Sequence, residues 1–399
     1  MASRGDEGRE TAVGQLDVTG WGFLAVLAAV TGLLWWRVMR YQPGGRVRWG
    51  YCRLNLVTAA LLTILLAADG VNSYFSYLPR VADVASVVTG TDSWTALQRQ
   101  DLRRADYAAV LHEAPHGGVL RLAVPDRGSG FGRSTALAYL PPQYFTEPLR
   151  RFPVVYLLHG SPGMPADWLR AGGAEQTGAH LAATGHPTLI VMPAMSHHWL
   201  DDSECVDSLR LKAETHLLRD VLPAVDGTFR TLPDPGGRVV AGMSAGGYCA
   251  LNLGLRHPDL FGAIVDLSGL DRPTHSGGAA ALFGKGPTGL AAAAANSPGQ
   301  YAASLPPGLA VRIWLDSGRA DGEVLSGLIH LRGVLAARGI PVRLTVRPGA
   351  HTYRVWRPAL RQALDWVPGA QMSTGTGQLR TKAKLPSTHS GRSLTSAQP

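Results

Sequence analysis

The feature that most constrains the fold is a serine held between two glycines, where a strand-like run meets a helix-like run. Residues 238–241 (RVVA) read as a strand around two valines, residues 242–246 read GMSAG, and residues 247–253 (GYCALNL) have helical character. Glycines on both sides let the backbone turn sharply, so the hydroxyl of Ser244 would stand at the carboxyl edge of a sheet. A structural turn with an incidental serine is the alternative, because GxSxG also occurs by chance.

A serine hydroxyl is a weak nucleophile unless a base activates it, so this chemistry requires a histidine elsewhere in the chain. His351 is favoured among the 13 histidines. It follows an expected last strand at residues 342–346 and a turn at residues 348–350, and it precedes a helix that begins near Tyr353. The sequence therefore predicts a Ser244–His351 pair.

An acid that orients this histidine is expected after the strand-like residues 311–315. Asp316, Asp321 and Glu323 all qualify by position. Asp321 is favoured, because the preceding loop gives it the reach to meet His351. Asp316, at the strand end, would instead tie the backbone of that loop. Asp316 and Glu323 remain alternative acids.

The transition state of acyl transfer also needs hydrogen-bond donors where negative charge develops. Residues 154–163 (VVYLLHGSPG) read as a buried strand followed by a loop, which would set the backbone N–H of Ser161 opposite that of Ala245. His159 is expected to be a structural residue beneath the loop, with a candidate contact to substrate. Three aromatic residues are further candidates for lining a substrate pocket: Trp168, Trp199 and Tyr353.

Strand-like and helix-like runs alternate through residues 117–367, which predicts an α/β domain with a mostly parallel sheet covered on both faces. The expected strands are residues 119–124, 135–140, 154–158, 188–192, 238–242, 263–267, 311–315 and 342–346. The expected helices include residues 212–225, 245–256, 323–338 and 354–366.

With these motifs in this order, residues 119–367 resemble the esterase-type α/β-hydrolases, which include feruloyl esterases, S-formylglutathione hydrolase and the cell-envelope mycolyltransferases. The resemblance is carried by LLHGSPG at 157–163, GMSAGG at 242–247, HPDLF at 257–261 and HTY at 351–353. It implies the α/β-hydrolase fold and a serine esterase that works through an acyl-enzyme, with no metal or organic cofactor. The substrate would be a small-molecule or lipid acyl ester.

The resemblance is weaker on the side of the substrate. Mycolyltransferases carry Asp-Gly, a large residue and an arginine at the oxyanion loop and use a glutamate as the acid, whereas this chain has HGSP at 159–162 and Asp321. Recognition of trehalose and mycolate therefore does not carry over. Two alternatives stay open: an acyltransferase that moves the acyl chain to a sugar or glycerol hydroxyl, and a catalytically silent wall-binding protein of the same fold.

Two apolar runs precede this domain. Residues 18–36 carry no charge over 19 residues, and residues 54–68 form a second run. Both are expected to be transmembrane helices, because each run approaches the length needed to cross a bilayer. The first is expected to be retained as an anchor, because its acidic leader at residues 1–17 does not suit a cleavable signal peptide. The short loop between them holds five arginines and no acid, which places it in the cytoplasm and the catalytic domain outside. If the second run were only interfacial, the same rule would leave the domain inside.

The net charge of +9 does not indicate nucleic-acid binding. The five arginines of the loop and four basic residues of the tail account for all of it: Arg37, Arg40, Arg46, Arg48, Arg53, Arg380, Lys382, Lys384 and Arg392.

Residues 73–116 are expected to be a linker and residues 368–399 a disordered tail. Outside the membrane Cys205 and Cys249 could form a disulfide, or they could be two small buried hydrophobic residues. The oligomeric state is not predicted.

Overall fold

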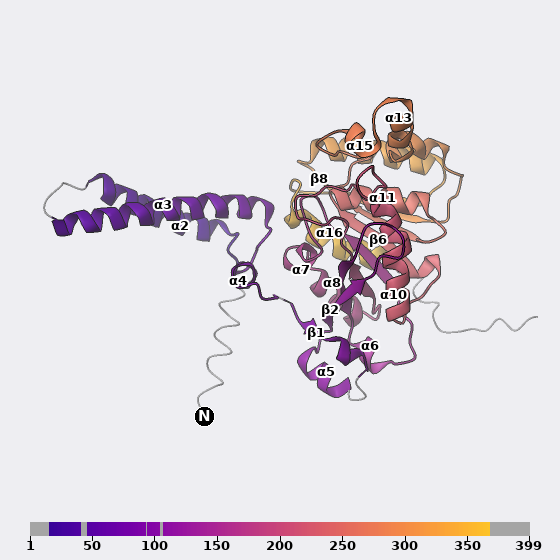
Figure 1. Ribbon diagram of the computed structural model, residues 1–399, viewed down its shortest axis with the longest axis horizontal. Coiled ribbons are helices and arrows are strands. Elements are labelled where there is room, and N and C mark those ends of the chain that lie inside the picture. Colours follow the sequence, from indigo (N-terminus) through magenta and orange to yellow (C-terminus); the bar gives the residue numbers. More distant parts are fainter. Residues whose placement is uncertain (1–15, 41–45, 93, 104–106, 368–399) are drawn as a thin grey trace, which may run out of the picture.

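The computed structural model describes residues 16–40, 46–92, 94–103 and 107–367. It consists of a helical hairpin that projects from an α/β domain (Figure 1). The expected leader, apart from its last residues, and the expected disordered tail lie outside the described residues.

In the described part of the chain the central sheet has nine strands in the order β1-β2-β3-β5-β4-β6-β7-β8-β9. The strands are β1 Ala96–Leu97, β2 Gly118–Val124, β3 Ser134–Leu140, β4 Val154–Leu158, β5 Leu189–Met192, β6 Arg238–Met243, β7 Ala263–Leu267, β8 Arg312–Gly318 and β9 Val342–Arg347. Neighbouring strands are parallel except at β3, which runs antiparallel to both β2 and β5. The predicted mostly parallel sheet is confirmed.

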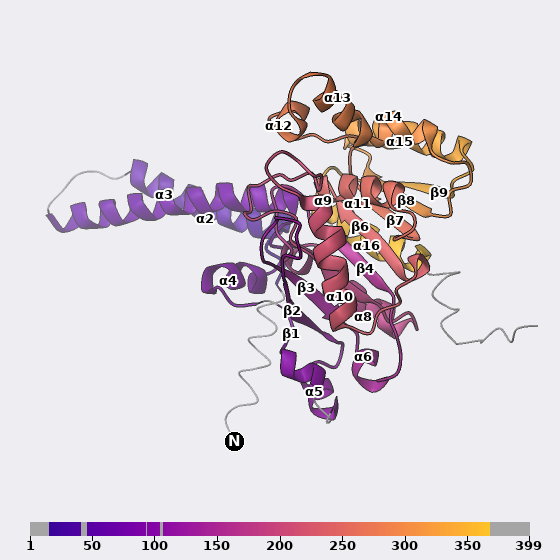
Figure 2. The ribbon, with the colours of Figure 1, turned by 45° about the vertical axis from the view of Figure 1, so that its right-hand side comes forward.

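Helices cover both faces of this sheet, which explains why its central strands are apolar on both sides. One face packs against α10 Leu222–Thr228, α11 Ala245–Arg256 and α15 Gly322–Ala337. The other packs against α7 Asp167–Arg170, α8 Ala174–Ala183 and α16 Tyr353–Trp366. In Figure 2, α10 and α11 lie in front of the strands and α16 lies behind them.

Shorter elements complete the domain. They are α5 Tyr107–Glu113, α6 Gln143–Thr146, α9 Ala213–His216, α12 Ala279–Phe283, α13 Gly286–Ala295 and α14 Pro298–Tyr301, with 3-10 turns at Arg99–Arg103, Pro235–Gly237 and Ala302–Ser304. The single helix expected at residues 212–225 is divided, because a π-helical turn, Leu217–Val221, separates α9 from α10. Pro223 in the first turn of α10 has no N–H to donate to the preceding turn.

The expected linker at residues 73–116 is more structured than a linker. It contains α4 Val81–Thr89 and α5, and its strand β1 pairs in parallel with β2 at the edge of the sheet. Two residues are too short a run to show strand periodicity, so the sequence did not reveal β1. The α/β domain therefore begins before residue 117.

The hairpin consists of α2 Trp21–Met39 and α3 Arg46–Phe75, which lie side by side (Figures 1 and 2). The indole N–H of Trp35 donates to Thr63 Oγ1 over 2.9 Å and links the two helices. Within the described residues, the segments Trp21–Met39 and Arg53–Phe75 are long and apolar enough to cross a bilayer, and a signal sequence near the N-terminus would pass the same criterion.

The foot of the hairpin, which we define as residues 16–20 and 73–81, is attached to the α/β domain. Its two segments pair with each other, since Val18 N–H donates to Pro79 O over 3.0 Å and Val81 N–H donates to Leu16 O over 3.1 Å. Arg354 of α16 donates to the carbonyl of Thr19 over 2.7 Å. The Tyr77 hydroxyl donates to Asp167, and its ring packs edge-on against Tyr353 at 5.7 Å.

Candidate active site

Ser244 occupies the sharp turn between β6 and α11. Its φ of 55° and ψ of −124° are rare for a residue with a side chain, and such strained positions are typical of functional turns. The flanking glycines are required by contact, because a Cβ on Gly242 would collide with the backbone of Gly246, and one on Gly246 would collide with the carbonyls of Leu158 and His159. The turn thus presents the serine hydroxyl at the carboxyl end of the parallel strands.

A continuous hydrogen-bond chain connects this hydroxyl to a carboxylate. His351 Nε2 lies 2.8 Å from Ser244 Oγ, and His351 Nδ1 lies 2.8 Å from Asp321 Oδ2. The histidine side chain is 37% exposed and the aspartate side chain 11% exposed, so the chain opens to solvent on the histidine side. The arrangement lets the imidazole take a proton from the hydroxyl while the carboxylate accepts from Nδ1.

Backbone hydrogen bonds hold the acid and histidine loops together. Arg319 N–H donates to Arg347 O over 2.7 Å, and Ala320 N–H donates to Gly349 O over 2.8 Å. A Cβ on Gly318 would lie against the backbone of Gly349, so the two loops can approach only because a glycine stands there. The ring of Trp356 packs perpendicular to His351 at 4.8 Å and limits its orientation.

The two alternative acids lie elsewhere. Asp316 is buried and accepts from Arg347 Nε over 2.8 Å and from the Trp314 indole over 3.4 Å. Side chains therefore hold Asp316, where the sequence suggested a bond to the loop backbone. Glu323 has a side chain that is 71% exposed and pairs with Arg272. Neither carboxylate is a partner of His351, so we assign both to structural contacts.

The loop after β4 lies directly against the serine. A Cβ placed on Gly160 would be 3.4 Å from Ser244 Cβ, and Gly160, Ser161 and Ala245 line one small cavity. Ala245 is the first residue of α11, whose amino end carries partial positive charge. The cavity of about 10 Å³ has room for about one water molecule.

The four candidate substrate contacts have different surroundings. His159 is buried with its Nδ1 2.8 Å from Gly160 O, and burial lowers its pKa to about 4, so it is a neutral structural residue. Trp168 has no exposed surface and donates to Leu158 O over 3.0 Å. Tyr353 is 6% exposed and packs on Trp356. The expected pocket role of Trp168 and Tyr353 is therefore wrong, because both belong to the core; Trp199 is 49% exposed and remains accessible.

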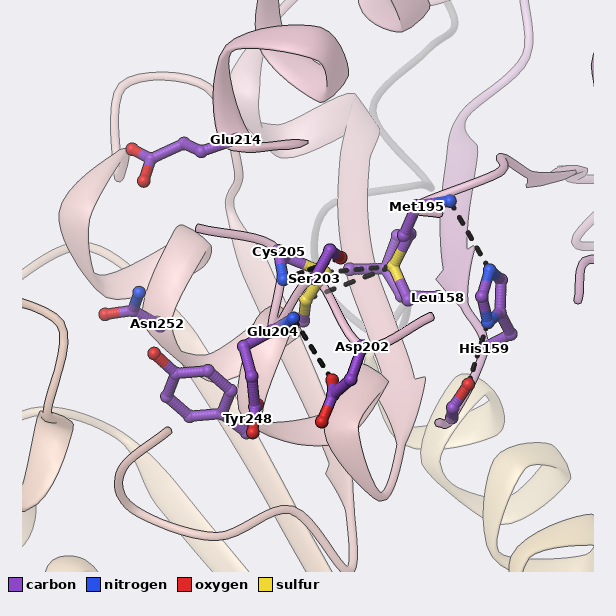
Figure 3. The surroundings of a disulfide bond; sticks show 12 residues. Leu158, His159, Met195, Asp202, Ser203, Glu204, Cys205, Glu214, Tyr248 and Asn252 are labelled. Carbon is purple, nitrogen blue, oxygen red and sulfur yellow. Dashed lines mark hydrogen bonds between the residues drawn. A yellow bond between two sulfur atoms is a disulfide. The ribbon is translucent and has the colours of Figure 1, made fainter. Parts of the chain in front are cut away.

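A disulfide closes the wall of the small cavity. Cys205 and Cys249 are bonded, with Cα atoms 5.6 Å apart, and join the loop at residues 201–205 to α11 (Figure 3). Glu204 and Cys205 both have a φ of 48°, a left-handed conformation that non-glycine residues rarely adopt. The covalent link therefore holds a strained loop against the helix that carries Ser244.

Opening this disulfide is expected to destabilise the domain. The bond closes a loop with a sequence separation of 44 residues, for which the loss of unfolded-state entropy predicts about 4 kcal/mol. Urea unfolding of the Cys205→Ser/Cys249→Ser variant, compared with the oxidised wild type, measures the difference. A change below about 1 kcal/mol would show that the bond does not constrain the chain.

Three carboxyl groups line the same cavity, those of Asp201, Asp202 and Glu204, and they were not anticipated from the sequence. Asp202 and Glu204 line the cavity, and Figure 3 shows both beside the disulfide. Glu204 Oε1 accepts from the Thr274 backbone N–H over 2.5 Å, and burial followed by the charge of Asp202 raises its pKa to about 7. The run DDSEC at 201–205 was the available signal, because acidic residues are rarely buried and three of them stand here beside a cysteine.

A further buried carboxyl lies beneath the serine turn. Asp266, at the end of β7, has no exposed surface. Its Oδ1 accepts from the Gly269 N–H over 2.6 Å, whereas its Oδ2 has no partner. Burial raises the pKa of Asp266 to about 8, against the lowering effect of the Gly269 amide. The group is therefore protonated in the native state at neutral pH.

This shift predicts a pH-dependent stability. From its ordinary pKa of 3.8 up to about 8, the unfolded chain releases the proton and the native chain keeps it. The stabilising contribution is complete below the ordinary pKa and is lost as the pH rises through the native value, at up to about 1.4 kcal/mol per pH unit. The free energy of unfolding of wild type relative to Asp266→Asn should therefore fall from pH 5 to pH 8 in urea titrations. A difference that stays constant with pH would contradict the assignment.

The sheet order and the serine turn define an α/β-hydrolase fold of the esterase type. A family model described as "Putative esterase" matches residues 131–367, more than half of the chain, so the chain belongs to this esterase family. A ferulic acid esterase structure superposes with a TM-score of 0.55 at 24% identity, covering 63% of this chain and 97% of that one. A fluorophosphonate-binding serine hydrolase of Staphylococcus aureus gives 0.53 at 19% identity, covering 63% and 98%. At these identities the two structures show the fold alone.

Two sequence relatives come from bacteria. An uncharacterized protein of Corynebacterium glutamicum is 27% identical over 337 residues, which are 80% of this chain and 77% of that protein. An esterase of Mycobacterium tuberculosis is 26% identical over 261 residues, 57% of this chain and 54% of the relative. The match to the corynebacterial protein is longer than the esterase domain and therefore reaches into the segments around it.

Proposed function

We propose that this protein is a membrane-anchored serine esterase that hydrolyses carboxylic acyl esters outside the cytoplasmic membrane. The observation that carries the proposal is the chain of two 2.8 Å contacts from Ser244 through His351 to Asp321. Membership of the esterase family supports the reaction class.

In the proposed reaction His351 Nε2 takes the hydroxyl proton as Ser244 Oγ attacks the acyl carbon. The new C–O bond makes a tetrahedral oxyanion, which the backbone N–H groups of Ser161 and Ala245 stabilise. The imidazolium gives its proton to the leaving alcohol as the ester bond breaks. A water molecule, deprotonated by the same nitrogen, then hydrolyses the acyl-enzyme and returns the serine. Asp321 holds the imidazole in the required tautomer and stabilises its charge.

The hairpin supplies the proposed anchor. Its apolar side chains are largely exposed, as at Leu33, Leu61 and Ile64, each at least 50% exposed. Aromatic residues gather at both ends, with Trp21 and Tyr74 near the foot and Trp36 and Tyr51 near the far end. At about 1.5 Å per residue, Trp21 and Trp36 are roughly 22 Å apart along α2, and Tyr51 and Tyr74 are roughly 35 Å apart along α3. Both distances are comparable with a hydrocarbon layer of about 30 Å.

We infer from the five arginines at the far end of the hairpin that this end lies in the cytoplasm and the α/β domain outside. The disulfide accords with an oxidising exterior. A periplasmic reporter fused after Pro399 should be active. Activity of a cytoplasmic reporter at the same position would contradict the proposed location without affecting the proposed chemistry.

Transfer of the acyl group to a sugar or glycerol hydroxyl is the alternative outcome of the same acyl-enzyme. Asp202 and Glu204 stand in the wall of the cavity beside Ser161 and Ala245, and these polar groups favour a short acyl group over a long apolar chain. Purified full-length protein is to be incubated with 4-nitrophenyl acetate and 4-nitrophenyl octanoate, with and without trehalose or glycerol. We expect free acid and faster turnover of the acetate. Acylated sugar or glycerol as the main product would favour the transferase instead.

A further inference from the structure

A second cavity lies between the foot of the hairpin and the α/β domain, away from the serine. It has a volume of about 530 Å³. Four of its lining residues are arginines that are distant in sequence: Arg80, Arg170, Arg357 and Arg361. Asp17 is the one acidic residue that lines it within the described part of the chain. The walls come from the foot, from the end of α7, from the start of α8 and from α16.

The arginines of this cavity are only partly neutralised. Arg80 pairs with Asp83 at 3.4 Å, and Asp17 Oδ1 is engaged by Thr19. Across the described residues no carboxylate lies within ion-pair distance of Arg170, Arg357 or Arg361. Trp94 lies under Arg170 at 5.9 Å, Arg357 donates to Ala171 O, and Arg361 donates to His180 Nδ1. The charges of Asp17 and Asp83 act on Arg357, so four arginines stand against two acids and the net charge around the cavity is positive.

Two of these guanidinium groups have buried donors without a partner. Arg170 Nε and Arg357 Nη2 are both inaccessible to solvent and make no hydrogen bond in the structure. A buried donor left unpaired typically costs about 1–3 kcal/mol, and more when the group is charged. Burial, and after it the positive charge of Arg80, lowers the pKa of Arg357. The positive charge of these side chains is what an anion in the cavity would balance.

The chemistry of the wall is that of a phosphate site. A planar guanidinium group can donate two parallel hydrogen bonds to two oxygens of one phosphate. The amino end of α8, a helix of 10 residues, adds partial positive charge, because its N-cap residue Gly173 and the nearby Gln176 and Thr177 line the same cavity. A carboxylate ligand would match the charge, but it has fewer acceptor oxygens for this number of donors.

The position of the cavity identifies the source of the phosphate. Asp17, Pro79 and Arg80 belong to the foot, next to the exposed aromatic residues Trp21 and Tyr74. In the proposed anchoring these aromatic side chains lie at the level of the lipid headgroups. We propose that this cavity binds the phosphate group of an anionic membrane phospholipid. The inference rests on the proposed anchoring and is independent of the proposed catalysis.

Binding is to be measured by calorimetric titration of the full-length protein in an uncharged detergent. The ligands are dihexanoyl phosphatidylglycerol, inorganic phosphate and the neutral lipid octyl glucoside. We expect saturable binding of the phosphatidylglycerol, much weaker binding of inorganic phosphate and none of the glucoside. Equal affinity for phosphatidylglycerol and inorganic phosphate would overturn the lipid assignment.

The variant Arg170→Gln/Arg357→Gln should bind phosphatidylglycerol at least about tenfold more weakly, because two charge-assisted contacts are lost. Arg219→Gln/Arg332→Gln, which changes two exposed arginines outside the cavity, is the matched control and should bind as wild type does. Arg361→Gln alters an exposed wall residue, keeps the core intact and should also weaken binding. Unchanged affinity in both cavity variants would overturn the proposal. The Ser244→Ala protein should bind normally, which separates this site from the proposed reaction.

Discussion

Replacing Ser244 by alanine is expected to lower kcat/KM for 4-nitrophenyl acetate by a factor between about 10⁴ and 10⁶. The hydroxyl is the group that would form the acyl-enzyme, and it lies 2.8 Å from the imidazole that would take its proton. Alanine removes the nucleophilic hydroxyl. The strand and the helix on either side of position 244 are expected to keep the backbone in the same turn. Initial rates over a range of substrate concentrations measure the loss.

Ser161→Ala is the matched control for this variant. Ser161 is expected to act through its backbone N–H, which alanine retains. Its hydroxyl makes a long contact of 3.4 Å to Asp201 O and a hydrogen bond to the Asp202 side chain. Its kcat/KM should stay within a few-fold of wild type. A Ser244→Ala protein that is folded by circular dichroism and retains more than about one tenth of the activity would rule out the proposed nucleophile.

Asp321→Asn is expected to lower kcat by about 10⁴-fold with little change in KM. An amide in place of the carboxylate can donate to His351 Nδ1, which turns the imidazole toward the wrong tautomer and leaves its charged form without a counter-ion. The 2.8 Å contact between Asp321 Oδ2 and His351 Nδ1 is the geometric basis of this expectation. Steady-state kinetics, with kcat and KM reported separately, measure the effect.

The other two carboxylates of this region provide controls of opposite kinds. Glu323→Gln changes an exposed side chain that pairs with Arg272 and should leave kcat unchanged. Asp316→Asn breaks the buried pair with Arg347 and should lower the free energy of unfolding, with kcat largely retained at temperatures where the protein is folded. A larger loss of kcat in folded Asp316→Asn than in Asp321→Asn would assign the acid role to Asp316.

Much of the fold could be predicted because its signals are local. The expected strands at residues 154–158 and 263–267 have the observed bounds, and so has the helix at residues 245–256. Each is a short apolar run or a helical run between turn residues, and these patterns depend on neighbours in the sequence. The two apolar N-terminal helices were recognisable for the same reason, although α3 extends beyond the expected run to Arg46 and Phe75.

Features that depend on tertiary contact could not be read from the sequence. Trp168 and Tyr353 have the composition of pocket residues, and only the packing of α7 and α16 places them in the core. The arginines of the second cavity come from positions 80, 170, 357 and 361, so no local run indicated a basic site. The preference for Asp321 rather than Asp316 as the partner of His351 followed from the loop that precedes Asp321. The catalytic role of Asp321 stays a prediction.

Covalent labelling tests the central claim most directly. Full-length wild type should react with a fluorophosphonate in a one-to-one ratio, and digestion followed by mass spectrometry should find the adduct on Ser244. The Ser244→Ala variant should remain unlabelled. Absence of label on folded wild type, or an adduct on a different residue, would contradict the proposal that Ser244 is the nucleophile of this esterase.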